Sequence, residues 1–376
     1  MLTIETIHRK LIDLGLISKA SIMNGDYEAT SIQRRNRNIH VKTLTEGSYL
    51  IKQVFSQSSD NSKTLTKEIQ FYHYMLENPL LFAELTATPR FVDIAETLLI
   101  VDYFVDSVPL WKYYRSQAAK DIPQQTVSAL GKMLGRFHRH ASLSEINTDK
   151  LHFLDNDLPF GFKLDQPSPN ILGHIHPGGI EFYRKLQSNR PLMEAWNKAT
   201  ESWEVNSLIH GDVKLDNILV LDGESNPTST HLRLIDWELV QFGDRTWDIA
   251  SVFQDFIFFW AISLPQKKTA QEMLKNARFS ITDLAPAINV FWQSYIKECE
   301  IGESQAVALL NKIIIYSGIR CCQTAYEISS KFDNFPPIAE IIFGLGSNII
   351  LSPEKATTDL FGIALPSNKN VSQSYA

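Results

Sequence analysis

The sequence has little cysteine and no excess of positive charge. Only three cysteines occur among 376 residues, Cys299, Cys321 and Cys322, and neither their number nor their spacing makes a disulfide framework or a zinc site. We expect them to be small buried side chains in a reducing compartment. The formal net charge at pH 7 is -6, so no overall positive field attracts the protein to nucleic acid or to anionic lipid.

Long apolar runs are also missing. The most apolar stretch, residues 256–264, is far shorter than the roughly 20 residues that cross a bilayer. It predicts a buried helix. Residues 1–16 alternate charged and apolar side chains at helical spacing and lack the apolar core and the cleavage site of a signal peptide. We therefore expect a cytoplasmic protein with neither a membrane nor nucleic acid as partner.

The length and composition predict two lobes. Single cores rarely grow beyond roughly 250–300 residues, and 44% hydrophobic with 21% charged residues is typical of a globular protein. Strand-like segments lie in 30–53, a helical stripe covers 65–76, and two further strand-like runs fall within 91–104. This order predicts five antiparallel strands with one helix after the third, which form a small α+β lobe over residues 1–105.

Beyond residue 105 the periodicity is mainly helical, so residues 106–364 are predicted to form a larger helical lobe. Residues 147–179 are rich in Pro, Gly and Asp and predict an irregular insertion. Its acidic and aromatic part, residues 151–165, could bind a cation, or could equally be a surface loop with buried aromatic rings. Residues 365–376 are polar and predict a flexible tail.

Three polar residues appear in an order that suits phosphoryl transfer. This chemistry needs a carboxylate that orients the attacking hydroxyl, oxygen ligands for Mg²⁺, and cations near the phosphates. Asp212 follows a short apolar run, Asn217 lies five residues later, and Asp236 directly follows the strand-like segment 232–235. Mg²⁺ prefers a few hard oxygen ligands, which Asn217 and Asp236 would supply, and Asp212 is then left as the base.

These residues lie in motifs that resemble a known family. HGDVKLDN at 210–217, IDWE at 235–238 and GDRTWDIAS at 243–251 are similar to motifs of the aminoglycoside phosphotransferase and choline kinase-like family, whose signature is His-Gly-Asp, four residues, Asn. The resemblance implies a bilobal protein kinase-like fold of the α+β class and an ATP-dependent phosphotransferase that uses Mg²⁺.

The resemblance also implies roles for single residues. Asp212 corresponds to the catalytic base, and Asn217 and Asp236 correspond to the magnesium ligands. His210 corresponds to a histidine that supports the loop, and Asp248 to an aspartate that braces the loop. His210 could instead be a general base or a metal ligand, but a single histidine without a partner at ligand spacing is more often structural.

Lys214 distinguishes this loop from many members of the family, which have another residue at this position. Ser/Thr protein kinases characteristically have lysine there. We expect Lys214 to neutralise the γ-phosphate during transfer. The alternative is a solvated loop lysine.

Lys52 and Glu68 are the corresponding candidates in the first lobe. Lys52 lies on the predicted third strand, like the lysine that holds the α- and β-phosphates in kinase-like folds. Glu68 lies on the following helix, where the resemblance implies an ion pair with Lys52.

A glycine-rich phosphate loop is absent between the first two predicted strands. RRNRN at 34–38 occupies that place, and arginine side chains and turn amides could contact phosphates instead of glycine backbone. The alternative phosphate loop is Asn24-Gly25-Asp26, with 34–38 as an ordinary hairpin. We favour 34–38, because its spacing to Lys52 fits better; the candidate contacts include Arg35, Asn36, Arg37 and Asn38.

The connection between the lobes falls at Asp102, Tyr103 and Phe104, whose backbone is expected to bind adenine. Backbone recognition has little side-chain signature, so ATP is expected and GTP is not excluded.

Three hypotheses remain for the acceptor. The first is a hydroxyl of a small molecule, as in the family that the motifs resemble. The second is a Ser or Thr hydroxyl of a ribosomal precursor peptide, with a separate lyase as partner in lanthipeptide-like biosynthesis; Lys214 suits this hypothesis. The third is a pseudokinase scaffold that binds nucleotide or peptide without catalysis.

Overall fold

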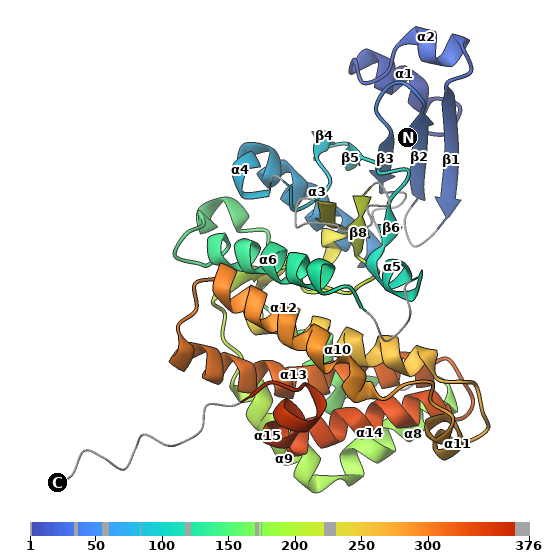
Figure 1. Cartoon of the computed structure of the whole chain (residues 1–376). Helices are drawn as coiled ribbons and strands as arrows, with labels where there is room; N and C mark the ends of the chain where they lie inside the picture. Colours follow the sequence, from blue (N-terminus) through green and yellow to red (C-terminus); the bar gives the residue numbers. More distant parts are fainter. Residues whose placement is uncertain are drawn as a thin grey trace, which may run out of the picture. The chain divides into compact units, whose positions relative to one another are not determined.

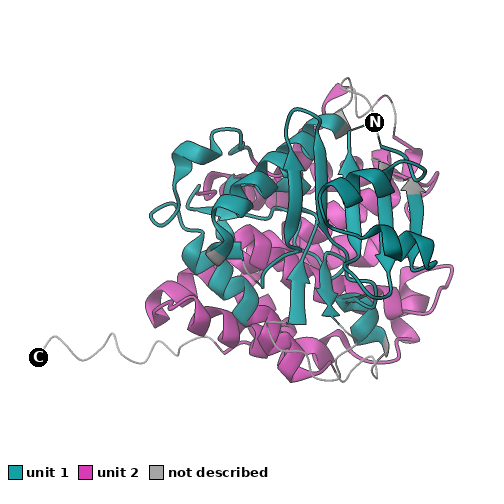
Figure 2. Ribbon diagram, turned by 90° about the horizontal axis from the view of Figure 1, so that it is seen from above, with its two compact units in different colours: residues 1–116, 132–157, 205–245 teal, residues 117–131, 158–204, 246–376 magenta. Residues whose placement is uncertain are grey.

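The computed structural model (Figure 1) describes residues 2–33, 37–54, 60–82, 84–116, 122–169, 173, 175–221 and 231–364. The chain divides into two compact units, which Figure 2 colours separately. The first unit comprises residues 1–116, 132–157 and 205–245, and the second comprises residues 117–131, 158–204 and 246–376. The first contains a five-stranded antiparallel sheet and the second is mainly helical, so the predicted α+β class is confirmed. The predicted lobe boundary near residue 105 stays a prediction, and the predicted tail 365–376 lies outside the described residues.

The sheet of the first unit has the strand order β1-β2-β3-β5-β4, and all of its neighbouring strands are antiparallel. A long helix, α3 (Asp60–Glu77), follows the third strand as predicted. The strands are β1 (Tyr27–Gln33), β2 (Arg37–Thr43), β3 (Tyr49–Gln53), β4 (Pro89–Asp93) and β5 (Leu98–Asp102).

The two faces of this sheet have different partners because side chains alternate along each strand. One face packs against α1 (Ile7–Asp13) and the residues that follow it, and α2 (Lys19–Met23) comes next along the chain (Figure 1). The buried residues of this cluster are Ile7, Leu11, Ile17, Ile39, Val41, Tyr49, Ile51, Leu98 and Ile100. Burying each large apolar side chain stabilises the unit by roughly 1.5–3 kcal/mol. The alternate residues of these strands lie on the opposite face of the sheet. They are Asn38 and His40 of β2 and Leu50 and Lys52 of β3.

The rest of the first unit surrounds the loop of residues 210–217. β7 (Ser207–Ile209) leads into this loop and β8 (Ile218–Val220) leaves it. β7 pairs with β10 (Gln241–Gly243), whereas β8 pairs with β6 (Val108–Pro109) and β9 (Leu232–Leu234). The remaining elements are α4 (Pro79–Phe82), α5 (Leu110–Ser116), η1 (Thr148–Leu151) and η5 (Trp237–Leu239). Two short strands therefore fix both ends of the loop that contains HGDVKLDN.

The second unit is built around long apolar helices. The predicted buried helix at 256–264 forms most of the second half of α10 (Arg245–Ser263). α6 (Gln124–His140) begins among the residues of this unit and ends among those of the first. The others are η2 (Phe160–Asp165), α8 (Pro177–Ser188), α9 (Arg190–Glu201), α11 (Ala270–Lys275), η6 (Ile281–Leu284), α12 (Ala285–Glu298), α13 (Glu303–Ser329), α14 (Pro337–Leu351), α15 (Pro353–Lys355) and the π-helical turn η7 (Ala356–Leu360).

The cysteines are free and buried, as expected from the sequence. Cys321 and Cys322 are neighbours in α13, and burial raises the pKa of both thiols, to about 12 for Cys322. Among the described helices, none combines the length and the apolar character that crossing a bilayer requires.

Candidate active site

The loop between β7 and β8 turns sharply at Gly211. Its φ of +81° lies in the left-handed region, which glycine enters without the steric cost of a Cβ atom. A Cβ atom at this position would also lie 2.5 Å from the carbonyl oxygen of Leu239. The close approach of these two backbones therefore requires glycine between His210 and Asp212.

We expect Gly211→Ala to lower the melting temperature much more than Gly15→Ala. Gly15 also has a positive φ, of +68°, but among the described residues, its chain neighbours aside, no atom lies within 4 Å of a Cβ atom built there. Alanine at Gly15 should cost about 1–2 kcal/mol for the backbone alone, whereas Gly211→Ala adds an overpacking cost of about 1–3 kcal/mol. Thermal unfolding of both variants checks this, and equal losses would contradict the packing argument.

His210 joins the loop to the strand that precedes Asp236. Its Nε2 lies 3.0 Å from the carbonyl oxygen of Ile235, and its Nδ1 lies 3.3 Å from the backbone nitrogen of Asp212. Because a carbonyl only accepts and a backbone N–H only donates, these contacts assign the Nε2–H tautomer. The side chain is fully buried. This geometry suits the predicted scaffold role rather than a free general base.

Asp212 lies between a cation and an amide of its own loop. Lys214 Nζ lies 2.6 Å from Asp212 Oδ2. Asn217 Nδ2 donates to the same oxygen at 3.2 Å and to the backbone carbonyl of Asp212 at 3.0 Å. The nitrogen of the Asn217 amide is thus directed toward Asp212, and its oxygen is left as a hard ligand atom.

Asp236 follows β9 in an unusual backbone conformation. Its φ is +70° and its ψ is 62°, the left-handed region that few non-glycine residues enter. The backbone N–H of the preceding residue, Ile235, donates to the carbonyl of Asn217 at 2.9 Å. The local strain therefore lies where the 232–236 strand end is hydrogen-bonded to the 210–217 loop, as is common at functional sites.

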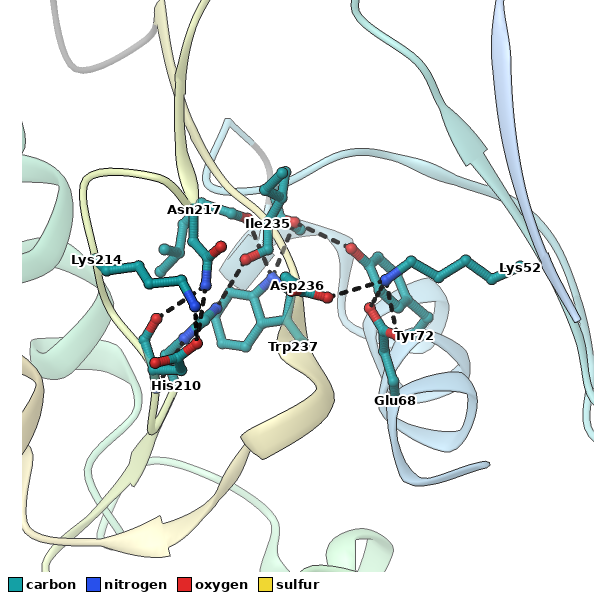
Figure 3. Close-up of polar contacts among 12 residues, drawn as sticks. Lys52, Glu68, Tyr72, His210, Lys214, Asn217, Ile235, Asp236 and Trp237 are labelled. Atoms are coloured by element: carbon teal, nitrogen blue, oxygen red, sulfur yellow. Dashed lines mark hydrogen bonds and ion pairs between the residues drawn. The ribbon is translucent and has the colours of Figure 1, made fainter. Parts of the chain in front are cut away.

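Lys52, Glu68 and Asp236 form one cluster of charges (Figure 3). Lys52 Nζ lies 2.7 Å and 2.9 Å from the two oxygens of Glu68 and 3.2 Å from Asp236 Oδ1. Glu68 comes from α3, and only 2% of its side chain is exposed, whereas 39% of the Asp236 side chain is exposed. The structure thus brings together three of the predicted residues from β3, α3 and the end of β9.

The cluster shifts the pKa values of its members. Burial alone would lower the pKa of Lys52, but the carboxylates of Glu68 and Asp236 outweigh it and raise that pKa. Burial raises the pKa of Glu68 despite the attraction of Lys52. For Asp236 burial acts in the same upward direction, yet Lys52, together with Lys214, lowers the net pKa. Asp236 is therefore an ionised carboxylate at neutral pH.

Trp237 packs the site against α3, which the sequence did not predict. Its indole ring centroid lies 4.6 Å from His210, 5.1 Å from Phe71 of α3 and 5.4 Å from Phe137 of α6. Its Nε1 donates to the hydroxyl of Thr86 at 3.0 Å. The residue after Asp236 thus fixes the loop, the helix that carries Glu68 and the strand end in one buried cluster.

The described end of the predicted phosphate loop, Asn38, lies at the same end of the sheet as Lys52. β1 pairs with β2 through Gln33 and Arg37, and Asn38 of β2 lies directly opposite Lys52 of β3. Arg35, Asn36 and the side chain of Arg37 lie outside the described part of the chain. The carbonyl oxygen of the Asn38 side chain is buried and makes no hydrogen bond within the described residues.

The alternative phosphate loop lies at the other end of these strands. Asp26 directly precedes β1, and its carboxylate accepts hydrogen bonds from the backbones of Leu44 and Thr45 after β2. Because β2 runs from Asn38 toward Thr43, this turn is separated from Lys52 by most of the strand. The structure therefore places Asn38, and not the 24–26 turn, beside Lys52.

Asp102, Tyr103 and Phe104 are held by side chains from three strands. Arg90 of β4 forms a two-point ion pair with Asp102 at 2.7 Å and 2.9 Å. His40 of β2 contacts the ring of Tyr103 at a centroid distance of 4.6 Å, and Arg233 of β9 lies 5.8 Å from the ring centroid of Phe104. The N–H groups of Asp102 and Tyr103 donate to Thr88 and Ser48. The backbone N–H groups of Asp102 and Tyr103 are therefore already used. Of the three residues predicted to contact adenine, Phe104 would supply the N–H donor.

Two further predictions concern Asp248 and the acidic stretch 151–165. Asp248 is fully buried in α10 and belongs to the second unit. In the acidic stretch 151–165, the Asp155 carboxylate pairs with Lys67, whereas Phe162 is buried against Trp247. These contacts favour buried aromatic rings and satisfied carboxylates over an open cation site.

The residues present fit a magnesium ion held by few protein ligands. Within the described residues, no group of three or more His, Cys, Asp or Glu side chains could hold a metal. Mg²⁺ usually takes one or two carboxylates with waters and substrate phosphates. The ionised, partly exposed carboxylate of Asp236 and the amide oxygen of Asn217 suit this mode of binding.

The sheet, the helix after its third strand and the two motif loops define a protein kinase-like phosphotransferase. The chain belongs to the phosphotransferase enzyme family (APH), whose model matches residues 26–277. This confirms the predicted family resemblance and the predicted class of enzyme, a phosphotransferase with an alcohol group as acceptor.

Solved structures show the same fold at low sequence identity. A choline kinase from Cryptosporidium parvum matches with a TM-score of 0.55 and 14% identity over 93% of this chain and 95% of its own. An ethanolamine kinase from Plasmodium vivax has a TM-score of 0.51 and 15% identity, with 96% and 90% covered. An amicoumacin kinase in complex with AMP-PNP and Ca²⁺ has a TM-score of 0.51 and 12% identity, with 91% and 96% covered. No curated protein matches the chain in sequence.

Proposed function

We propose that the protein transfers the γ-phosphoryl group of ATP to a hydroxyl group of a small molecule. The observation that carries this proposal is the cluster of Lys52, Glu68 and Asp236 in the same unit as the Asp212–Asn217 loop. It supplies a cation for phosphates, oxygen ligands for magnesium and a carboxylate for the acceptor, which are the parts that phosphoryl transfer requires.

The nucleotide lies along the sheet face that carries Lys52. Lys52 contacts the α- and β-phosphates while Glu68 orients it, and Asn38 lies beside the phosphates. His40 lies two positions along β2 from Asn38, which is about 6.8 Å in a strand. It lies opposite Leu50 of β3, and its ring contacts the ring of Tyr103. The adenine base stacks on the partly exposed rings of His40 and Tyr103, and the backbone at 102–104 forms hydrogen bonds with the edge of the base.

Asn217 and Asp236 hold magnesium, and His210 keeps their two segments together through Ile235. When bound, the ion offsets the negative charge of the phosphate oxygens. The described residues offer the ion two oxygen ligands, one from the 210–217 loop and one from the end of β9. The hydrogen bond between Ile235 and Asn217 joins these two segments.

Asp212 orients the acceptor hydroxyl and accepts its proton. The hydroxyl oxygen then forms a bond to the γ-phosphorus, and the bond from that phosphorus to the β–γ bridging oxygen breaks, so that ADP leaves. Asn217 Nδ2 holds the carboxylate of Asp212 in place during this step.

Lys214 pairs with Asp212 in this structure. When ATP binds, Lys214 pairs with the γ-phosphate instead and neutralises its charge. We expect Lys214→Met to lower kcat by about a hundredfold, the lower end of the range for loss of one electrostatic contact in a transition state. Lys214→Arg keeps the charge and should retain more activity. Steady-state kinetics of both variants check this; wild-type kcat in Lys214→Met would show that Lys214 is a solvated loop lysine.

The acceptor is a small molecule with a hydroxyl group. The similar structures are kinases of choline, ethanolamine and amicoumacin, which are all small molecules. At 12–15% identity they support a class of acceptor rather than one compound.

Mass spectrometry of reaction mixtures tests the proposal. The protein is incubated with ATP and Mg²⁺ and, separately, with pools of amino alcohols, sugars, hydroxylated antibiotics and Ser/Thr-containing peptides. We expect phosphate to appear in one of the small-molecule pools. Phosphate only in the peptide pool would replace this proposal with the peptide hypothesis, which would then require a lyase partner. Nucleotide binding without any transfer would favour the scaffold.

A further inference from the structure

Residues 147–157 form a packed segment in the first unit, although their composition predicts an irregular insertion. The side chain of Asn147 caps η1 by accepting from the backbone of Asp149. Leu151 is fully buried and Leu154 is 9% exposed. The segment therefore has a defined position on the unit.

The segment contacts α3 at two places. Lys150 Nζ lies 2.8 Å from Glu77 Oε2 at the last residue of the helix. Asp155 Oδ2 lies 3.4 Å from Nζ of Lys67, the residue before Glu68. The two helix positions are ten residues apart in the sequence, which is about 15 Å along an α-helix. Two contacts so far apart restrain the tilt of α3 as well as its position.

The same segment is bound to the strands of the catalytic loop. The backbone N–H of Phe242 donates to the carbonyl of Asp155, and Gln241 Nε2 donates to the carbonyl of Asp157, both at 2.9 Å. Gln241 and Phe242 belong to β10, which follows Asp236 closely and pairs with β7, the strand before His210. Asp155 thus contacts α3 through its side chain and β10 through its backbone.

We propose that residues 147–157 position α3, and with it Glu68, relative to Lys52 and Asp236 for nucleotide binding. The inference rests on the proposed function. The two carboxylates around Lys52 come from α3 and from the segment between β9 and β10. The 147–157 segment joins these two elements directly. Because the Lys52–Glu68 contact is 2.7 Å long, a small outward movement of α3 breaks it.

Charge reversal at Asp155 tests the inference. Asp155→Lys places a second cation beside Lys67 and keeps the backbone carbonyl that β10 uses. We expect the Kd for ATP·Mg²⁺ to rise about threefold to tenfold, the scale of one exposed ion pair lost and made repulsive. Amide hydrogen exchange in α3 should become faster. The double variant Lys67→Asp with Asp155→Lys restores the pair and should recover the wild-type Kd.

One control variant separates positioning from general stability, and a second pair of variants repeats the test. Arg190→Glu breaks the exposed Arg190–Glu194 pair of the second unit and should leave the Kd and exchange in α3 unchanged. Lys150→Glu, alone and combined with Glu77→Lys, repeats the test at the other end of α3.

The possible outcomes are distinct. Wild-type protein that does not bind ATP·Mg²⁺ would overturn the proposed function and this inference with it. Wild-type binding with an unchanged Kd in Asp155→Lys would overturn the inference alone. So would a raised Kd that the double variant fails to restore, because the loss would then not come from the pair with Lys67.

Discussion

Replacement of Asp212 by asparagine should abolish phosphoryl transfer while the nucleotide still binds. The loss of a general base typically costs about 10²–10⁴ in rate. Asparagine keeps the shape of the side chain but accepts no proton from the acceptor hydroxyl. Lys52 and Glu68, which hold the phosphates in the proposed site, lie on other elements and are unchanged. We therefore expect kcat to fall by about 10³ or more with little change in the Kd for ATP·Mg²⁺.

Asp216 provides a matched control for this prediction. It lies in the same loop, one residue before Asn217, and it is exposed. Asp216→Asn removes the same charge four residues from Asp212 and should keep kcat near the wild-type value. Coupled ADP-release kinetics and calorimetric nucleotide binding are the measurements. If Asp212→Asn turns over at the wild-type rate, or if Asp216→Asn loses as much activity, Asp212 is not the base.

Replacement of Asp236 by asparagine should remove the effect of magnesium on nucleotide binding. The pKa of Asp236 is lowered by Lys52 despite burial, so the side chain carries a full negative charge near pH 7. Asparagine keeps the size of the side chain and tolerates the φ of +70°, but as a neutral group it binds Mg²⁺ far more weakly. We expect transfer to fall by about 10³-fold or more.

The Kd of ATP, measured with and without Mg²⁺, gives the direct readout for Asp236→Asn. In the wild-type protein magnesium should strengthen binding, and in the variant this difference should largely disappear. Unfolding measurements with Asp216→Asn alongside establish that the fold is kept. Wild-type magnesium dependence in the variant would place the metal elsewhere.

Much of the fold could be predicted because its signals are local in the sequence. The strands alternate apolar and polar residues, and the helix that carries Glu68 has its apolar stripe at helical spacing. Lys52 and Asp236 were predicted from their places on a strand and at a strand end, and Glu68 was predicted from the family resemblance. The structure then places Lys52 Nζ within 3.2 Å of a carboxylate oxygen of Glu68 and of Asp236.

Other parts depend on contacts between distant segments, which one sequence does not reveal. Trp237 packs on Phe71 and Phe137, which are more than 90 residues away in the sequence. No local pattern distinguishes such a tryptophan from any other buried one. The contact of Asp155 with Lys67 is equally non-local, so the role of the 147–157 segment could not be predicted from its composition.

One missed residue did have a signal in the sequence. Asn38 and His40 lie two positions apart on one strand, and Leu50 and Lys52 lie two positions apart on the next, so all four share a face. Once Lys52 is placed toward the phosphates, the same alternation places His40 on the nucleotide side.

The most direct test of the central claim follows the γ-phosphoryl group itself. ATP with heavy oxygen in its γ-phosphoryl group is incubated with the protein, Mg²⁺ and the acceptor pool, and the products are analysed by mass spectrometry. The proposed reaction predicts a phosphorylated small molecule that carries the heavy oxygens, with ADP in equal amount and none of this product with Asp212→Asn. A product that carries AMP, or a folded protein that binds ATP and transfers nothing to any small molecule, would contradict it.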